Sequence, residues 1–378
     1  QDHRRRHTGQ GLAVRIGLVS SAQQVCPPLG YGAEAATWDL AVALERKGHR
    51  VALFAPKGSK TPRGGLFEIP RSPDGQAQQR VEAWTVLEYE DTSRELDILH
   101  DMSLAFGAHE AACRGFSCGG TGPAHHCTLN GISYALPRHP YQHNVVVVSQ
   151  SALEHADGRG AWYGTPYENL WTGTIPPSAN TQVVRYGRDH EFYSPGGEQG
   201  DYILFVGRPH KAKGVGLILD LAESWPDQQF ILAWRADLPD HKEREVEYLA
   251  RANKIRNVAH VELPVEGHHE AKRDLMARAR VLLHPNVYID ACPVVPIEAQ
   301  LCGAPVVAWD RGGLRECSTS GTAVLEPLPK RYWEDREGTS RKLHEMCERA
   351  LALSRSGIRE YALRDLTAER MAEDYLKV

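Results

Sequence analysis

The chain has 378 residues, of which 42% are hydrophobic and 24% are charged, and its formal net charge is −4. This length exceeds what one ordinary hydrophobic core serves and predicts two domains of roughly 150–200 residues each. The small net charge gives no general reason to expect nucleic-acid binding, and no apolar run approaches the roughly 18 residues of a membrane span, so we expect a cytoplasmic protein. Residues 1–12 are basic and polar and are expected to form a disordered tail, with a peripheral membrane contact as the alternative.

Strand and helix patterns alternate in the first part of the chain. Residues 14–21 form an apolar run of strand length, residues 33–48 carry apolar side chains at helical spacing, and residues 50–56 form a second strand run. This succession predicts a βαβ unit, the start of a doubly wound parallel sheet. Gly30 and Gly32 lie in the loop before the helix, where glycine lets the backbone approach a ligand, although an ordinary turn explains them equally well.

Polar side chains stand at the ends of the strand runs that follow. Four further runs continue the sheet, at residues 96–102, 125–131, 144–150 and 181–187. Ligands bind at the carboxyl ends of parallel strands. This rule selects His100, Asp101, Asn130 and Ser149. A single histidine at a strand end is more often a hydrogen-bonded structural residue than a catalyst, so the rule alone assigns no role.

Eight cysteines in a chain of this length do not indicate a disulfide scaffold. Four of them stand singly in apolar or helical contexts and are expected to be reduced core or surface thiols: Cys292, Cys302, Cys317 and Cys347. One segment collects cysteine and histidine: His109, Cys113, Cys118, His125, His126 and Cys127. Such a set can bind zinc, but its spacing matches no CxxC pairing, so we expect a Gly-rich loop with scattered thiols, and a metal site at Cys113, Cys118 and Cys127 is the weaker alternative.

A second set of alternating strands and helices begins after residues 188–201, a polar segment with proline and glycine that is typical of a linker between domains. The first expected strand of this second set spans residues 202–207. Arg208 and Lys213 flank the loop that follows this strand. Two cations fixed at the carboxyl end of a strand would neutralise a diphosphate. Solvated surface charges are the alternative.

Residues 281–316 read as strand, loop, short helix, tight turn and strand. Pro296 suits a first helical turn and Gly303 suits a helix C-terminus, which predicts a helix of about two turns. Its start offers unpaired backbone N–H groups and a partial positive charge, both of which favour a phosphate. Glu298 follows in that helix and can accept hydrogen bonds from sugar hydroxyls, as a ribose would supply. A nucleotide-diphosphate ligand is therefore predicted.

Four stretches, taken together, carry a resemblance to a known family: GYGAE before the first helix, VVRYGRDHEFYSP, FVGRPHKAKG, and IEAQLCGAPVVAWDRGGLRE. In the second stretch the matching positions are Gly187, Asp189 and Phe192. Over nearly its whole length, the chain resembles the GT-B glycosyltransferases of family 4, also called glycosyl transferases group 1. The region around GYG and the acidic motif are most similar to members that glycosylate orthosomycins such as avilamycin.

The resemblance implies an α/β protein with two facing Rossmann-like domains, a deep cleft between them and a C-terminal helix that crosses back. The expected acceptor domain spans residues 13–190, joined by residues 357–378. The expected donor domain spans residues 191–356. A nucleotide sugar would bind mainly to the second of these and a hydroxyl acceptor mainly to the first.

The resemblance also assigns roles to residues. Arg208 and Lys213 would contact the donor diphosphate, Glu298 the ribose hydroxyls, and Asp290 would lie near the donor sugar. The expected donor site comprises Gly32, Arg208, Lys213, Pro293, Val294, Val295 and Glu298. The expected acceptor side comprises Gly30, Tyr31, Glu34, Asp101 and Asn130. Arg208, Lys213, Asp290 and His100 are the candidate catalytic residues.

Several positions depart from the family pattern. Asp290 stands where glutamate is usual, and Pro293 replaces a glycine and so lacks an N–H that could bind the sugar. The strand after the donor loop usually ends in glycine where this chain has Trp234 and Arg235, so the base or diphosphate pocket is expected to differ in shape from that of the family. Asn130 is the best match to a strand-end histidine, and asparagine cannot serve as a base. His100 is a candidate replacement, but no catalytic base is assigned.

The function that these features imply is a retaining, metal-independent transfer of a hexosyl group from a nucleotide-diphosphate sugar, with UDP or GDP as the preferred carriers, to a hydroxyl acceptor. No cofactor is expected beyond that co-substrate. One alternative is a GT-B protein that binds a nucleotide sugar with weak turnover. Another is a different GT-B-shaped enzyme, such as a sugar-nucleotide epimerase or a phosphorylase. The sequence gives no indication of the oligomeric state.

Overall fold

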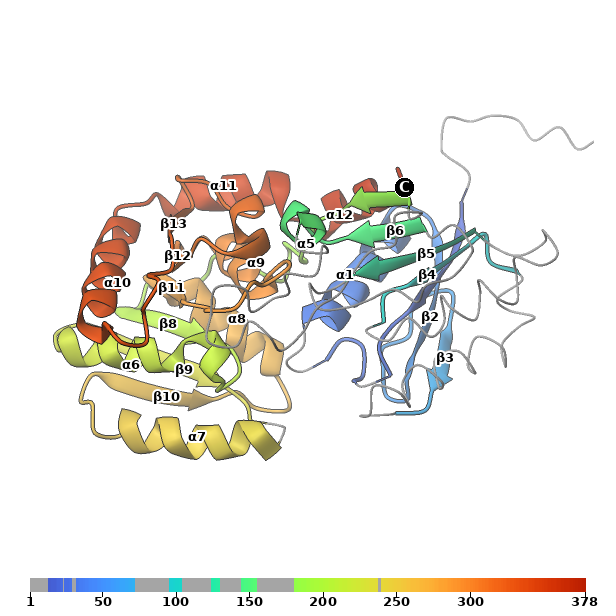
Figure 1. Cartoon of the computed structure of the whole chain (residues 1–378). Coiled ribbons are helices and arrows are strands. Elements are labelled where there is room, and N and C mark those ends of the chain that lie inside the picture. The colour runs from blue at the N-terminus through green and yellow to red at the C-terminus, as the bar shows by residue number, and fades with distance from the viewer. Residues whose placement is uncertain are drawn as a thin grey trace, which may run out of the picture. The chain divides into compact units, whose positions relative to one another are not determined.

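The computed structural model describes residues 13–22, 24–28, 32–71, 95–103, 124–129, 144–154, 180–236 and 239–378 (Figure 1). The expected tail at residues 1–12 lies outside them. The described strands form two sheets, and every strand pair whose register the described residues define is parallel. The prediction of an α/β fold with parallel sheets is confirmed.

The first sheet has the strand order β3-β2-β1-β4-β5-β6-β7. Its strands are β1 (Arg15–Val19), β2 (Arg50–Pro56), β3 (Leu66–Ile69), β4 (Ile98–Asp101), β5 (Ala124–Leu129), β6 (Asn144–Val147) and β7 (Asn180–Val183). Helix α1 (Gly32–Arg46) connects β1 to β2, which confirms the predicted βαβ unit. Helix α5 (Gln150–Glu154) follows β6.

The second sheet has the order β10-β9-β8-β11-β12-β13. Its strands are β8 (Tyr202–Val206), β9 (Gln229–Trp234), β10 (Val258–Glu262), β11 (Val281–His284), β12 (Val306–Trp309) and β13 (Ala323–Glu326). Its helices are η1 (Lys211–Lys213), α6 (Val215–Ser224), α7 (Pro239–Ala252), α8 (His268–Arg278), α9 (Val294–Leu301), η2 (Gly312–Glu316), α10 (Arg336–Leu351), α11 (Arg355–Asp365) and α12 (Ala368–Tyr375). Strands β8, β11 and β12 are buried along their whole length, as the continuous apolar runs of a parallel sheet predict.

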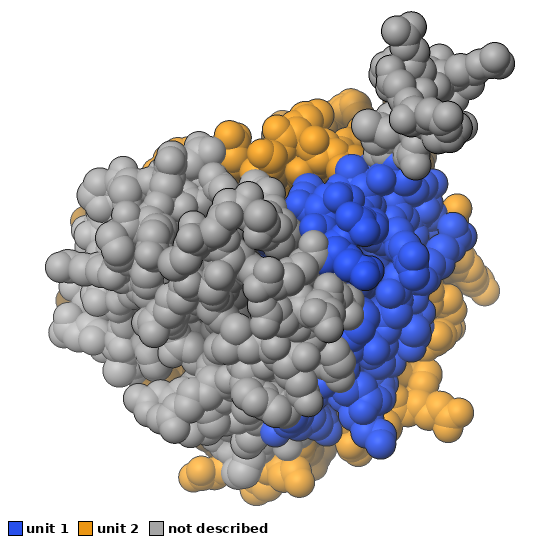
Figure 2. Space-filling view, turned by 90° about the vertical axis from the view of Figure 1, so that its right-hand side faces the viewer, with its two compact units in different colours: residues 1–26, 41–127 blue, residues 27–40, 128–378 orange. Residues whose placement is uncertain are grey.

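The chain divides into two compact units (Figure 2). Residues 1–26 and 41–127 form the first, and residues 27–40 and 128–378 form the second. In the first unit, Phe54 of β2 stacks on Phe67 of β3 with ring centroids 5.0 Å apart. Together with Val19 and Leu99, Phe54 belongs to a core cluster between the strands. The expected domain boundaries, at residues 190 and 357, stay a prediction.

In the second unit, helices α6, α7 and α10 share one large core with the six-stranded sheet. Phe205, Trp234 and Trp309 from the strands and Met346 from α10 are among its buried members. Helices α8 and α9 contact each other, and α9 also contacts α11. This second group of helices includes α9, the helix that the sequence predicted beside a phosphate. None of the helices in the described ranges is both long enough and apolar enough to cross a membrane.

The last helix of the chain docks on residues 185–188. The amide of Arg188 donates to the carbonyl oxygen of Leu366 at 3.0 Å, and the amide of Ala368 donates to the carbonyl oxygen of Arg188 at 2.9 Å. At Gly187 a Cβ atom would lie 1.9 Å from the carbonyl oxygen of Thr367. Only glycine permits this approach, which gives a structural reason for one of the three family positions in this segment.

We therefore expect Gly187→Ala to destabilise the fold, because the new methyl group would displace the backbone at Thr367. Overpacking of this kind typically costs about 1–3 kcal/mol. Gly216→Ala is a matched control, since a Cβ there meets nothing within 4 Å and lies in helix α6. Urea unfolding followed by circular dichroism measures both variants. A Gly187→Ala midpoint equal to that of the control would contradict the close docking of α12.

Candidate functional site

The loop after β8 places two cations. The chain turns through η1, where the His210 side chain accepts a hydrogen bond from the amide of Ala212 at 3.1 Å. Gly214 ends this turn with φ at 74°, and a Cβ there would lie 2.3 Å from a backbone carbonyl oxygen. The end of this turn therefore requires glycine. Arg208 is exposed at its start, and Lys213 is largely buried at its end.

Helix α9 begins as the sequence predicts. Pro296 lies in its first turn, and Gly303 follows its end with φ at 75°. The preceding residue, Pro293, is extended and makes no side-chain capping hydrogen bond. First-turn N–H groups have no partner within a helix, so the start of α9 presents hydrogen-bond donors and the positive end of the helix dipole.

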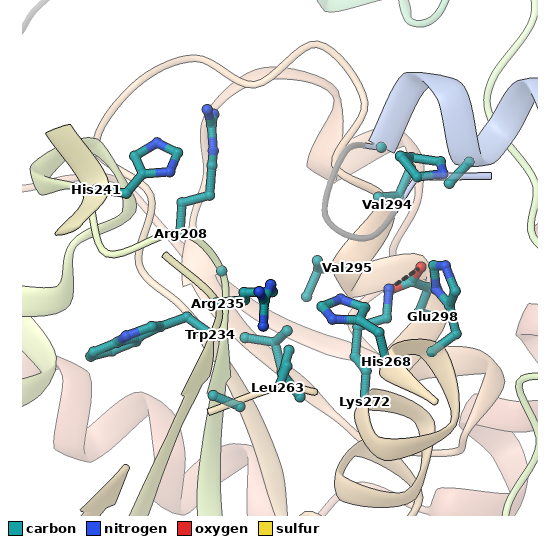
Figure 3. Close-up of a pocket in the computed structure, with 17 residues that line it drawn as sticks. Arg208, Trp234, Arg235, His241, Leu263, His268, Lys272, Val294, Val295 and Glu298 are labelled. Carbon is teal, nitrogen blue, oxygen red and sulfur yellow. Dashed lines mark hydrogen bonds and ion pairs between the residues drawn. The ribbon is translucent and has the colours of Figure 1, made fainter. Parts of the chain in front are cut away.

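Both features border one pocket of about 690 Å³, a volume that includes the solvent at its mouth. It is lined by Pro28, Gly32, Ala35, Val206, Gly207, Arg208, Ala233, Trp234, Arg235, His241, Leu263, His268, His269, Lys272, Val294, Val295 and Glu298. Arg208 comes from the loop after β8, Trp234 from the end of β9 and His241 from α7 (Figure 3). Lys272 comes from α8, and Val294 and Glu298 come from α9.

Glu298 is completely buried at the pocket and is paired with two cations. Lys272 Nζ lies 2.9 Å from each of its carboxylate oxygens (Figure 3). Arg188 contacts Oε1 through Nε and Nη2, each at 3.1 Å. Burial alone would raise the pKa of Glu298, but the charges of Lys272 and Arg188 outweigh burial and lower it. The carboxylate is therefore ionised at neutral pH.

Residues 189–353 match the family model described as glycosyl transferases group 1. The matched segment is thus similar to the glycosyl transferases group 1 and covers less than half of the chain. It contains the second sheet, and every pocket residue from Val206 to Glu298 falls inside it.

A named protein and several solved structures are also similar to this chain. D-inositol 3-phosphate glycosyltransferase of Xylanimonas cellulosilytica is 34% identical over 127 residues, which are 33% of this chain and 28% of that protein. The alignment thus spans little more than a quarter of the length of this relative.

Solved structures match over almost the whole chain at low identity and show the fold, which is GT-B. AviGT4, a glycosyltransferase involved in avilamycin A biosynthesis, matches with a TM-score of 0.65 and 20% identity over 96% of each chain. Sucrose-phosphate synthase of Thermosynechococcus elongatus matches with a TM-score of 0.70 and 17% identity, over 96% of this chain and 98% of that one. Anabaena HepE in complex with UDP matches with a TM-score of 0.67 and 16% identity, with the same coverage.

Within the glycosyl transferases group 1 segment, Lys213 lies apart from the pocket lining. Its Nζ is 2.6 Å from the hydroxyl oxygen of Tyr288 and 3.4 Å from Asp290 Oδ2. Tyr288 donates a hydrogen bond of 2.5 Å to the same carboxylate oxygen. Burial lowers the pKa of Lys213, and the charge of Arg208 adds to this effect. The loop thus carries one exposed cation and one largely buried cation, and their contact with a diphosphate stays a prediction.

Asp290 keeps a negative charge in these surroundings. Burial would raise the pKa of its carboxyl group, but the Lys213 charge and the Tyr288 hydrogen bond overcome burial and lower it. Gly313 fixes the loop from the other side, because its amide donates to the carbonyl oxygen of Asp290 at 2.9 Å. The predicted position of Asp290 beside the donor sugar stays a prediction.

Among the expected donor residues, Gly32 lines the pocket at the start of α1. A Cβ there would lie 2.9 Å from Cγ2 of Val294, so the first turns of α1 and α9 approach each other closely at a glycine. Val294 and Val295 also line the pocket. Pro293 directly precedes α9 and is not among the residues that line the pocket.

The expected acceptor residues are only partly described. Gly30, Tyr31 and Asn130 lie outside the described residues, and so do Cys113 and Cys118 of the alternative metal site and the side chain of Cys127. Glu34 is buried in α1. His100 and Asp101 end β4, both buried, and Asp101 Oδ1 accepts a hydrogen bond from the amide of Ser103 at 2.8 Å. The roles of these residues stay predictions.

The structure also describes Ser149, a predicted strand-end residue, and the four cysteines that were expected to be reduced. Ser149 Oγ accepts a hydrogen bond from the amide of Ala152 at 2.9 Å, so this side chain supports the start of α5. The four cysteines expected as reduced thiols are free and buried: Cys292, Cys302, Cys317 and Cys347. These thiols were expected either in the core or at the surface, and the structure places all four in the core. No group of three or more potential metal-binding side chains occurs among the described residues.

Sequence reasoning missed the two cations that hold Glu298. Lys272 stands among the many charged residues of α8. Arg188 stands between Gly187 and Asp189, which match the family, but Arg188 was not itself one of the matching positions. The altered positions Trp234 and Arg235 both line the pocket. The Trp234 ring is buried, with Nε1 donating to Glu245 at 2.7 Å.

Proposed function

We propose that this chain is a retaining, metal-independent glycosyltransferase that moves a hexosyl group from a nucleotide-diphosphate sugar to a hydroxyl acceptor. The observation that carries the proposal is the shared pocket of Arg208, the start of α9 and the buried carboxylate of Glu298. A diphosphate needs positive charge and N–H donors, and a ribose needs a fixed acceptor for its hydroxyls. The match of residues 189–353 to glycosyl transferases group 1 supports the same ligand class.

Departure of the nucleoside diphosphate is the step that this pocket assists. Breaking the bond from the sugar to the diphosphate leaves negative charge on the leaving oxygen and oxocarbenium character on the sugar. The guanidinium of Arg208 and the N–H groups at the start of α9, which border the pocket, would stabilise that oxygen. Lys213, outside the pocket lining, would add the field of a second cation from the same loop. Fixed donors of this kind are worth on the order of 3 kcal/mol each in the transition state.

The surroundings of the two carboxylates support a retaining reaction without a protein nucleophile. Glu298 is ion-paired with two cations, and Asp290 is held by Lys213 and Tyr288. Each carboxylate is therefore engaged by protein donors, which disfavours a role as the nucleophile that a retaining glycosidase uses. In front-face attack, the acceptor hydroxyl approaches from the side that the diphosphate leaves, and the departing phosphate takes the hydroxyl proton.

The donor is proposed to be a UDP-sugar or a GDP-sugar. Solved structures of Anabaena HepE, which shares the fold, contain UDP or UDP-glucose. In this chain the part of the pocket nearest the ends of β8 and β9 is lined by Trp234, Arg235, His241 and Leu263. Such a mixture of flat apolar and polar groups suits a nucleobase.

Release of nucleoside diphosphate tests the proposal. The full chain is incubated separately with UDP-, GDP-, ADP- and TDP-glucose, with and without EDTA, and free diphosphate is quantified. We expect release from at least one donor at a rate that EDTA does not change, because protein cations supply the charge. No release from any donor despite binding would favour a nucleotide-sugar-binding protein. Loss in EDTA that magnesium restores would contradict the metal-independent scheme.

A further inference from the structure

Lys272 is a buried cation whose ammonium group lies against the carboxylate of Glu298. It belongs to α8, is only 8% exposed, and lines the same pocket as Glu298. Burying an ammonium group costs several kcal/mol unless a carboxylate compensates it. Burial lowers the pKa of Lys272, and the charge of Glu298 acts in the opposite direction. A structural role alone could be met by apolar side chains, so the position of this charge at a pocket wall needs an explanation.

Arg188 reaches the carboxylate from a different element and is itself held firmly. Its Nη1 lies 2.8 Å from Asp39 Oδ2, and its Nη2 donates to the hydroxyl oxygen of Tyr193 at 3.2 Å. Arg188 and Asp39 are nearly completely buried. The guanidinium therefore has a fixed orientation, and it presents two nitrogens to Glu298 Oε1.

The two cations divide the carboxylate oxygens of Glu298 unequally. Oε1 accepts hydrogen bonds from both Arg188 and Lys272. Oε2 lies 2.9 Å from Lys272 Nζ but accepts no hydrogen bond from any described residue. With Arg188 alone, the carboxylate could still rotate about its last torsion angle, because that torsion has broad minima. Lys272, in contact with both oxygens, removes this freedom.

We propose that Lys272 is a positioning residue that holds Oε2 of Glu298 toward the sugar of a bound nucleotide and so makes the pocket select ribonucleotides over 2′-deoxyribonucleotides. The inference rests on the proposed nucleotide-diphosphate donor and adds a residue and a selectivity to it. A fixed, ionised acceptor forms a strong hydrogen bond with a ribose hydroxyl. When the hydroxyl is missing, Oε2 stays buried with its ion pair to Lys272 but without a hydrogen-bond donor from the ligand, which disfavours the deoxy ligand.

Calorimetric titration of the full chain with matched ligand pairs tests this. The probes are UDP and 2′-deoxy-UDP, with GDP and 2′-deoxy-GDP as the second pair. In the wild-type chain we expect the ribonucleotide to bind about tenfold to 100-fold more tightly than its deoxy counterpart. In Lys272→Met this ratio should fall to about threefold or less, with the affinity for the deoxy ligand nearly unchanged. A general packing defect would instead weaken both ligands equally.

Two further variants complete the design. Lys254→Met removes an exposed lysine in the turn after α7 and should retain the wild-type ratio. Lys272→Arg keeps the charge and so protects folding, but its planar fork cannot place one nitrogen against both oxygens, so its ratio should also fall. If Lys272→Met fails to fold, the ratio of the two affinities measured for Lys272→Arg tests the inference instead.

The outcomes separate the inference from the proposed function. A wild-type ratio retained in the Lys272 variants overturns the inference. A wild-type chain that binds both members of each pair equally, yet releases diphosphate from a nucleotide sugar, overturns the inference and leaves the glycosyltransferase proposal intact. A chain that neither binds a diphosphate nor releases one overturns both.

Discussion

Replacing Arg208 by alanine should lower turnover about 100-fold or more while the fold remains intact. Arg208 is exposed at the pocket wall, so its replacement removes no buried side chain from a core. Its proposed task is to stabilise charge that develops only as the diphosphate departs, and a fixed donor of this kind is worth on the order of 3 kcal/mol in the transition state. The loss should therefore appear mainly in kcat rather than in KM.

Lys211→Ala is the matched control for Arg208→Ala. Lys211 is a cation of the same loop, but it lines a different surface hollow, beside Tyr332 and Trp333. It removes one positive charge at a similar place in the sequence and should leave kcat within about twofold. Arg208→Lys should lie between the two, because lysine keeps the charge without the fork that binds two oxygens. Near-normal turnover of Arg208→Ala on the donor that releases diphosphate would remove the diphosphate assignment.

Local sequence patterns were sufficient for the parts of the site that one element or one turn determines. The length of α9 follows from Pro296 and Gly303, and the position of Arg208 follows from an apolar strand run that ends just before it. These features need only short-range information, since helix ends and buried strands are marked by adjacent residues.

The ion pairs around Glu298 could not be predicted in the same way. Lys272 is 26 positions from Glu298 and Arg188 is 110 positions away, and no spacing rule connects residues across such distances. The pairing of Lys213 with Asp290 bridges 77 positions and was likewise not anticipated. The sequence assigned Lys213 to a ligand and assigned no role to Lys272 or Arg188. In the fold, each of these three cations has a carboxylate of the protein as its partner. A charge that is largely removed from water requires compensation whether or not a ligand is present.

Replacing Glu298 by alanine should have the largest effect on stability of any substitution at the site. Lys272 and Arg188 would keep their positive charges in a buried position with the Glu298 carboxylate gone, while Arg188 would keep its contacts with Asp39 and Tyr193. Removing one partner of a buried ion pair typically costs about 3–5 kcal/mol. The donor affinity should fall as well, because the proposed acceptor for the ribose hydroxyls is absent.

The pH dependence gives this prediction a second reading. The pKa of Glu298 is lowered in the folded protein from its ordinary value of 4.5, so the folded state binds this proton less tightly than the unfolded state. The stability that the pairing supplies is thus fully present above pH 4.5 and is lost as the pH falls toward the lowered pKa. The difference in urea midpoint between wild type and Glu298→Ala should therefore be largest near neutral pH and should shrink in acid.

A double substitution distinguishes an unpaired charge from a simple cavity. If Glu298→Ala destabilises mainly by leaving Lys272 uncompensated, then adding Lys272→Met removes that charge and should recover part of the loss, on the order of 1–2 kcal/mol. If the cavity left by the missing side chain dominates, the second substitution should add to the damage instead. Recovery of stability without recovery of nucleotide affinity is the expected combination, because the double variant restores charge balance but not the acceptor for the ribose.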